Sequence, residues 1–231
     1  MDADTLVTGA VQVLIVVLAM SVHEAAHAFT AERFGDPTPR LLGRVSLNPL
    51  RHADLFGSLL LPLAMVLLRI PPFGWGRPGV VVARNLRGRR SALLVAAAGP
   101  AANLAMGAVA AAGLAVAVRV LGAPARDAAA AALQWSFLRD PAAAGLAHFP
   151  LLFTLVQLSY LSAVFALFHL LPVPPLDGGQ ILLELLPADW AARYAALRPY
   201  GFMIAMGLAM LGVLTLASAP VVVALWLVIQ L

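Results

Sequence analysis

Long apolar stretches recur along this chain from its first residues to its last. Of its 231 residues, 62% are hydrophobic and 11% are charged, whereas soluble domains are nearer half apolar and a quarter charged. An apolar stretch of about 20 residues is long enough to cross the hydrocarbon core of a bilayer as a helix. The pattern therefore predicts an all-α polytopic membrane protein, with the lipid bilayer as the solvent for most of the chain.

Four stretches are long enough to be complete spans: Leu6 to about Ala31, Ser91 to about Leu121, Pro150–Leu171, and Tyr200 to about Ala217. Leu55–Leu68 reaches only about 21 Å at 1.5 Å per residue, which is less than the ~30 Å hydrocarbon core. Pro220–Leu231 is also too short to span alone, and it either extends the fourth span or turns back. We find no internal repeat and no soluble second domain. Residues 1–231 are therefore predicted to form a single membrane-embedded domain.

Two connecting segments carry weaker signals. Arg126–Leu138 is expected to form a helix on the outer surface of the membrane, with Trp135 at the depth of the interface. The run Val80–Val82 is β-branched and follows a segment rich in Gly and Pro. Such a run favours a short strand or a small β hairpin.

The sharpest local signal is the pentapeptide HEAAH at residues 23–27. Histidines four residues apart lie on one face of a helix, so the imidazoles of His23 and His27 can reach one metal ion. Glu24 can activate a water molecule on that metal. Because ionisable side chains inside an apolar span are costly, we interpret the motif as a zinc site rather than a buried polar patch. The chain has no cysteine, so further ligands must be histidines or carboxylates.

A third ligand must come from elsewhere, and Asp177 is the best candidate. It follows the third span in the sequence LPVPPLDGG, where Gly178 and Gly179 allow a tight turn and a close approach of backbones. Asp177 can instead cap the short helix that begins near Gln180, which is a common role for aspartate. The residues favour the ligand over the cap and leave both open.

Charge and chain direction indicate where the site lies. Arginines follow the first span and recur between Arg69 and Arg90, and arginine beside apolar spans marks the cytoplasmic side. The histidine pair then lies near the cytoplasmic face. If Leu55–Leu68 crossed the membrane, Asp177 would arrive on the opposite side. We therefore predict that this segment is re-entrant, so that Asp177 arrives beside the histidines.

These residues are part of a series of motifs that resembles the site-2 proteases, which cleave transmembrane segments of other proteins. The likeness covers nearly the whole chain, and it is greatest to the compact bacterial branch that lacks PDZ and CBS domains. The motifs, in chain order, are HEAAHAFTAERFGD, GRVSLNPLRHADLFGSLLLP, FGWGRP, AAAGPAANL and LLPVPPLDGGQIL. The resemblance implies that His23, His27 and Asp177 bind one Zn2+ per chain and that Glu24 is the general base.

The resemblance also marks residues around the site. Asn103 belongs to a family motif on the second span, where close helix packing and an internal partner for its side chain are the simplest role. We also keep it as a candidate for substrate binding. His52 and Asp54 match the family as well. They either surround the metal and line the substrate path, or stabilise their own loop as a pair. We assign no role to His148.

One position departs from the family pattern. Family members usually carry Asn where this chain has His169, eight residues before Asp177, and that Asn is thought to contact substrate. Our hypothesis is that His169 donates a hydrogen bond to the substrate carbonyl or to the tetrahedral oxyanion. The alternative is a histidine at the membrane interface with an ordinary partner.

The sequence thus predicts an intramembrane zinc metalloprotease of the cell's inner (plasma) membrane. Its expected substrates are single-span membrane proteins, cut in or near their transmembrane segments. A helical substrate must unwind before attack, and Val80–Val82 can offer an edge that pairs with it. The alternative is a metal-binding transporter or scaffold without proteolysis, which has no need of Glu24. No nucleic-acid partner is expected, because the membrane explains the arginines.

Overall fold

The structure is a computed structural model that describes residues 3–68, 72–77, 79–88, 90–138 and 150–231. Among them, three helices are long and apolar enough to cross a membrane: α1 (Ala3–Arg33), α5 (Ser91–Leu121) and α7 (Pro150–His169). They match the first three predicted spans to within a few residues. The shorter helices are α2 (Thr38–Leu41), α3 (Pro49–His52), η1 (Leu55–Leu60), α4 (Leu61–Leu67), η2 (Ala83–Asn85), α6 (Ala123–Leu138), α8 (Asp177–Leu185), α9 (Ala188–Ala195), η5 (Arg198–Tyr200), α10 (Gly201–Met210) and α11 (Val213–Gln230).

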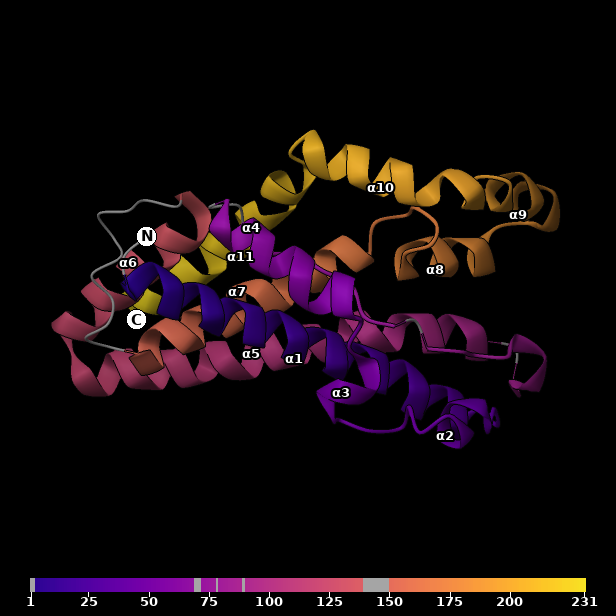
Figure 1. The fold of residues 1–231 in the computed structure, drawn as a ribbon, viewed down its shortest axis with the longest axis horizontal. Coiled ribbons are helices and arrows are strands. Elements are labelled where there is room, and N and C mark those ends of the chain that lie inside the picture. The colour runs from indigo at the N-terminus through magenta and orange to yellow at the C-terminus, as the bar shows by residue number, and fades with distance from the viewer. Residues whose placement is uncertain (1–2, 69–71, 78, 89, 139–149) are drawn as a thin grey trace.

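The three long helices pack side by side in one bundle (Figure 1). His27 of α1 contacts Val95 of α5, and His23, one turn earlier in α1, contacts Asn103, two turns later in α5. The helices α1 and α5 therefore run in opposite directions.

The third long helix, α7, runs in the same direction as α1. Gln12 of α1 bonds to Gln157 of α7, and His23 packs on His169 at the end of α7. The end of α1, the start of α5 and the end of α7 therefore meet at one end of the bundle. That end also carries α8, at the right of Figure 1.

The chain between α1 and α5 leaves this end of the bundle and returns to it. The helices η1 and α4 run along α1 until Val66 packs on Gly9, in the first turns of α1. The chain is back beside η1 by Trp75, whose N–H donates to the Gly57 carbonyl at 3.1 Å. The short apolar segment thus enters and leaves the bundle at the same end.

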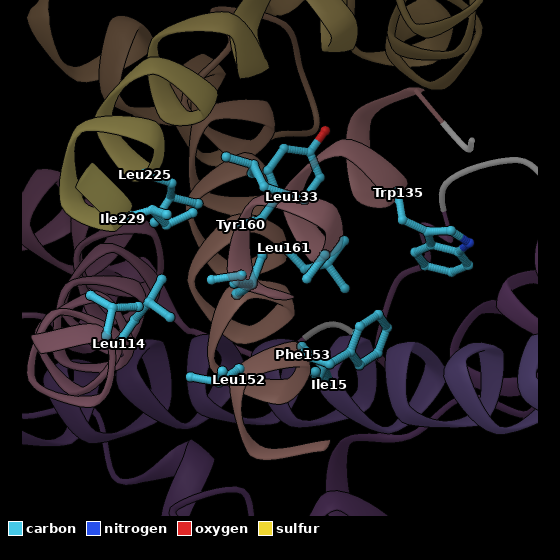
Figure 2. Close-up of a cluster of buried hydrophobic side chains, with 14 of the residues drawn as sticks. Ile15, Leu114, Leu133, Trp135, Leu152, Phe153, Tyr160, Leu161, Leu225 and Ile229 are labelled. Atoms are coloured by element: carbon cyan, nitrogen blue, oxygen red, sulfur yellow. The ribbon is translucent and has the colours of Figure 1, made fainter. Parts of the chain in front are cut away.

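The main hydrophobic core lies toward the other end, where α5, α6, α7 and α11 meet (Figure 2). Its largest fully buried apolar side chains come from α5, α7 and α11: Leu114, Val118, Leu152, Val156 and Ile229. This core holds the ends of α1 and α7 in register for the site described below.

Helix α6 confirms the predicted helix at Arg126–Leu138 and packs on this core, and its place at the membrane surface stays a prediction. Its fully buried face consists of alanines at helical spacing: Ala125, Ala129 and Ala132. Such small side chains allow close packing, and α6 lies against α7 and α11. Trp135 is also buried, with its ring 5.6 Å from that of Phe153.

The fourth predicted span is divided into two helices. Gly212, between α10 and α11, adopts φ +79°, a left-handed conformation that glycine accepts readily and that interrupts a helix. The prediction of one helix from Tyr200 to about Ala217 is therefore wrong. Pro220 lies inside α11, so Pro220–Leu231 continues that helix instead of forming a separate segment.

Val80–Val82 does not form a strand, and the described residues contain neither a strand nor a hairpin. Val82 is extended, but side chains accept from two backbone N–H groups, one in this segment and one just before it. The N–H of Gly79 donates to Glu24 Oε2 at 2.9 Å, and the N–H of Val82 donates to Asp36 Oδ2 at 2.7 Å. Because these acceptors replace a neighbouring strand, no ladder forms.

Candidate metal centre

Two histidines of α1 converge where the three long helices meet. His23 and His27 are one turn apart, and their Nε2 atoms lie 3.0 Å from each other. His27 Nδ1 lies 2.7 Å from the Val95 carbonyl oxygen, so Nδ1–H donates to it and Nε2 keeps its lone pair. A neutral imidazole with a free Nε2 is the form that binds a metal ion.

Asn103 of α5 holds the other histidine. Its amide nitrogen lies 3.3 Å from His23 Nδ1, and its side chain is fully buried. The amide oxygen has no partner among the described residues. If the amide is turned by 180°, this oxygen accepts the Nδ1–H of His23, and the amide nitrogen takes the position without a partner. This orientation leaves His23 Nε2 free for a metal.

Asp177 brings the third donor group from the first residue of α8. Its Oδ2 lies 2.9 Å from His23 Nε2, and its Oδ1 lies 3.2 Å from His27 Nε2. The residue before it holds the N-cap position, so Asp177 is not the helix cap. Gly178 permits this approach, because a Cβ there would lie 2.1 Å from the Leu170 carbonyl oxygen.

The contacts of Asp177 also set its charge. Burial by itself raises the pKa of this carboxyl, but the hydrogen bond from His169 and the close contacts with His23 and His27 hold the pKa well below its usual range. The group is therefore an anion that offers only acceptor oxygens, which is the state that a cation requires.

The donor set fits a catalytic zinc ion. The ligand atoms of His23, His27 and Asp177 all lie within 4.8 Å of one another. Zinc binds histidine nitrogen and carboxylate oxygen at about 2.0–2.2 Å, and catalytic sites keep a fourth position open. Gly99 of α5 makes room for this cluster. A Cβ there would lie 2.4 Å from His27 Nε2 and 2.6 Å from His23 Nε2.

A cavity of about 900 Å³ opens beside the cluster, and Glu24 and Asp177 line it. Glu24 Oε2 accepts its hydrogen bond from the N–H of Gly79, which also lines the cavity. Apolar and aromatic side chains make up most of the remaining wall, including Phe73, Trp75, Phe165 and Phe202. The wall of the cavity is therefore mainly apolar.

The other predicted site residues differ in whether they line the cavity. His169 lines the cavity, and its Nδ1 lies 3.0 Å from Asp177 Oδ2. The hydrogen bond from His169 to substrate stays a prediction. Val81 also lines the cavity, whereas Val80 is exposed. His148 lies outside the described residues.

His52 and Asp54 do not line the cavity, and they bond to different groups. His52 is buried, and its Nε2 lies 2.7 Å from the Ser46 carbonyl oxygen. Asp54 Oδ1 accepts from the N–H groups of Phe56 and Gly57, so it caps η1. Both residues stabilise the loop before the short apolar segment, though not as a pair.

Asp36, to which the sequence analysis assigned no role, connects two parts of the site. It is fully buried just after α1 and accepts from the N–H of Val82 at 2.7 Å, from Asn85 Nδ2 at 2.9 Å and from Thr38. Although burial raises the pKa of this carboxyl, hydrogen bonds from Asn85, Thr38 and Val82 lower it to about 2. An aspartate before proline is common in turns, so its sequence context carries no distinguishing signal.

A cluster of two histidines and a carboxylate, with a glutamate beside it, defines a metal-dependent hydrolase. The apolar helices around it define a membrane protein. The sequence profile described as peptidase family M50 matches residues 11–214. The chain belongs to this family, and it is a zinc metalloprotease of the site-2 protease type.

Three curated relatives are about one-third identical to this chain over the residues that align. The Bacillus subtilis protein named "Putative zinc metalloprotease YwhC" is 34% identical over 194 residues, which are 83% of this chain and 76% of that protein. Proteins named "Putative zinc metalloprotease Rip2" are 33% identical in Mycolicibacterium smegmatis, over 81% of this chain and 61% of the relative. In Mycobacterium tuberculosis the identity is 32%, over 79% of this chain and 54% of the relative. No solved structure matches the chain.

Proposed function

We propose that this protein cleaves the transmembrane segments of single-span membrane proteins, with Glu24 as the general base. In this proposal His23, His27 and Asp177 hold a single Zn2+. The observation that carries it is the convergence of two Nε2 atoms and a carboxylate next to Glu24. The cavity beside them is mostly apolar, which suits side chains drawn from a membrane span.

The site residues divide the chemistry between them. Zinc, when bound, polarises the scissile carbonyl and acidifies a water molecule. Glu24 accepts a proton from the water as its oxygen attacks the carbonyl carbon. The proton then passes to the amine nitrogen as the C–N bond breaks. The N–H of Gly79 holds the Glu24 carboxylate in place for both transfers.

Substrate binding is proposed to involve Val80–Val82. A transmembrane helix satisfies its carbonyls internally, so it must unwind before cleavage, and lipid cannot replace the lost hydrogen bonds. Val81 lines the cavity and Val82 is extended. The N–H of Gly79, just before the segment, donates to Glu24, and the N–H of Val82 donates to Asp36. An unwound substrate can pair with this segment by strand addition.

We further propose that the site faces the cytoplasm and that residues 1–231 form one domain in the plasma membrane, the inner membrane of the cell. Arginine concentrates on cytoplasmic faces. It gathers from the last residue of α1 to the residue before α5: Arg33, Arg40, Arg44, Arg51, Arg77, Arg84, Arg87 and Arg90. Leu55–Leu68 is then a re-entrant segment. The end of α11 lies beside Arg126, away from the site, so α10 and α11 together make the fourth crossing.

Cleavage in a defined bilayer tests the proposal. The purified protein is placed in liposomes with a panel of single-span proteins that carry a fluorescent tag on the cytoplasmic end. We expect a tagged fragment that disappears when zinc is removed by a chelator and returns when zinc is added back. Cleavage that survives zinc removal contradicts the proposal. Zinc binding without any fragment supports a transporter or scaffold.

A further inference from the structure

We propose that His169 is a positioning residue for the zinc ligand Asp177, an inference that rests on the zinc site proposed above. His169 is the last residue of α7, and Asp177 is the first residue of α8. His169 Nδ1 lies 3.0 Å from Asp177 Oδ2, and both side chains are mostly buried. A hydrogen bond between these two residues thus joins the end of α7 to the start of α8 at the metal centre.

The direction of this hydrogen bond follows from its acceptor. A carboxylate oxygen accepts only, so the hydrogen lies on His169 Nδ1. A neutral imidazole carries one N–H, and Nε2 then presents a lone pair. In this form His169 has no donor for a substrate oxyanion, and its effect passes through Asp177.

His169 is not itself a member of the metal-binding group. Among the described residues, the atoms that converge within 4.8 Å come from His23, His27 and Asp177. The His169 ring packs against three other rings, 4.3 Å from that of His23, 4.6 Å from that of Phe165 and 5.8 Å from that of Phe168. These contacts fix the ring plane and keep Nδ1 beside Asp177. Loss of such a partner of a metal ligand weakens metal binding by about 10–100-fold.

Three substitutions separate the Nδ1 contact from the volume of the ring. The side-chain nitrogen of His169→Asn can occupy the position of Nδ1, that of His169→Gln lies closer to the position of Nε2, and His169→Leu has none. Zinc affinity is measured without turnover, by titrating the zinc-free proteins against a chromophoric chelator. We expect His169→Leu and His169→Gln to bind zinc about 10–100-fold more weakly, and His169→Asn to stay within about threefold of wild type.

Two patterns overturn the proposal: zinc affinity as low in His169→Asn as in His169→Leu, or wild-type affinity in all three variants. Circular dichroism of the zinc-free proteins checks folding. If His169→Leu does not fold, the zinc affinities of His169→Asn and His169→Gln are compared instead, and equal affinities contradict the proposal. Visible absorption of the Co(II)-loaded His169→Asn protein should match wild type, and a changed spectrum would make His169 a ligand. Failure of wild type to bind zinc contradicts the proposed function instead.

Discussion

Helices α1 and α7 carry two buried polar clusters of opposite character. The amide cluster, formed by Gln12, Gln157 and Ser136, lies near the starts of both helices. Gln12 Nε2 donates to Gln157 Oε1 at 2.8 Å, and Gln157 Nε2 bonds to Ser136 of α6. All three side chains are almost fully buried, and none lines the cavity.

The zinc cluster, formed by His23, His27 and Asp177, lies near the ends of the same two helices. Its side chains are ionisable, their donor atoms converge on one point, and the cavity opens beside them. The amide cluster has neutral groups that satisfy one another and link three helices. Burial of polar side chains in a membrane protein therefore does not by itself indicate a catalytic site. The zinc cluster differs in that its acceptor atoms converge and a cavity opens beside them.

The largest expected effect is that of Glu24→Gln, next to the zinc cluster, on the rate of cleavage. Loss of the general base should lower the cleavage rate by about 10²–10⁴-fold. Zinc content and thermal unfolding should not change, because the amide has the same shape. Glu32→Gln, also on α1 and paired with Arg40, is the control and should keep activity. Initial rates of fragment release measure the effect. A Glu24→Gln protein with more than about a tenth of wild-type activity contradicts the assignment.

Gly99→Ala tests whether the histidine nitrogens meet where the structure places them. A Cβ at Gly99 would overlap both Nε2 atoms, so zinc affinity should fall by about 10–100-fold. Gly113→Ala on the same helix is the matched control, because its Cβ would make an ordinary contact of 3.5 Å with Leu155. Chelator competition measures both variants. Equal affinities would show that the cluster lies elsewhere.

Asp36 extends the comparison to a charged group that is buried without being catalytic. Asp36→Asn should lower stability by about 1–3 kcal/mol, because hydrogen bonds to a charged acceptor are lost. The folded-state pKa of about 2 is below the ordinary 3.8. The ionised form therefore stabilises the fold above pH ~4, and this contribution is lost as the pH falls toward 2.

Thermal unfolding of wild type and Asp36→Asn at several pH values measures this contribution. The difference between the two proteins should be constant from pH ~5 to ~8 and should shrink in acid. The exposed Asp189→Asn is the control and should have little effect at any of these pH values. If the difference in stability between wild type and Asp36→Asn grew as the pH fell, Asp36 would not be ionised in the folded protein as we assign it.

The smallest effect is expected in the amide cluster. Gln157→Leu removes the bonds to Gln12 and Ser136 and should cost about 1 kcal/mol of stability, as is typical for hydrogen bonds between membrane helices. Zinc content should not change. Gln134→Leu, an exposed glutamine on α6, controls for the loss of an amide. Loss of zinc in Gln157→Leu would contradict the claim that the amide cluster has no part in metal binding.

The convergence of His23, His27 and Asp177 was predictable because each residue carries a local signal. His23 and His27 have the spacing of one helical turn, and Asp177 follows a span in a glycine-containing turn. The sequence also allowed Asp177 to be the N-cap of the next helix. The structure excludes that role, because Leu176 holds the N-cap position of α8. The partners of the cluster were not predictable, because the contacts of Asn103 with His23 and of His169 with Asp177 join separate helices.

The errors in the fold arise where sequence patterns are ambiguous. The packing of α6 on the core, by contrast, had no sequence signal, because its buried face consists of alanines, which give little contrast between a surface helix and a packed one. The break at Gly212 depends on one positive φ inside an apolar run. Val80–Val82 has the composition of a strand, but the acceptors that replace its partner come from Glu24 and Asp36, far away in sequence.

Zinc content of the purified protein, measured by elemental analysis, tests the central claim most directly. The account predicts about one zinc per chain in wild type, Glu24→Gln and Gln157→Leu, with zinc lost in Asp177→Ala. This result would establish the zinc cluster as the metal site and separate it from both the base and the amide cluster. Wild-type zinc content in Asp177→Ala, or no zinc in wild type, would contradict the account.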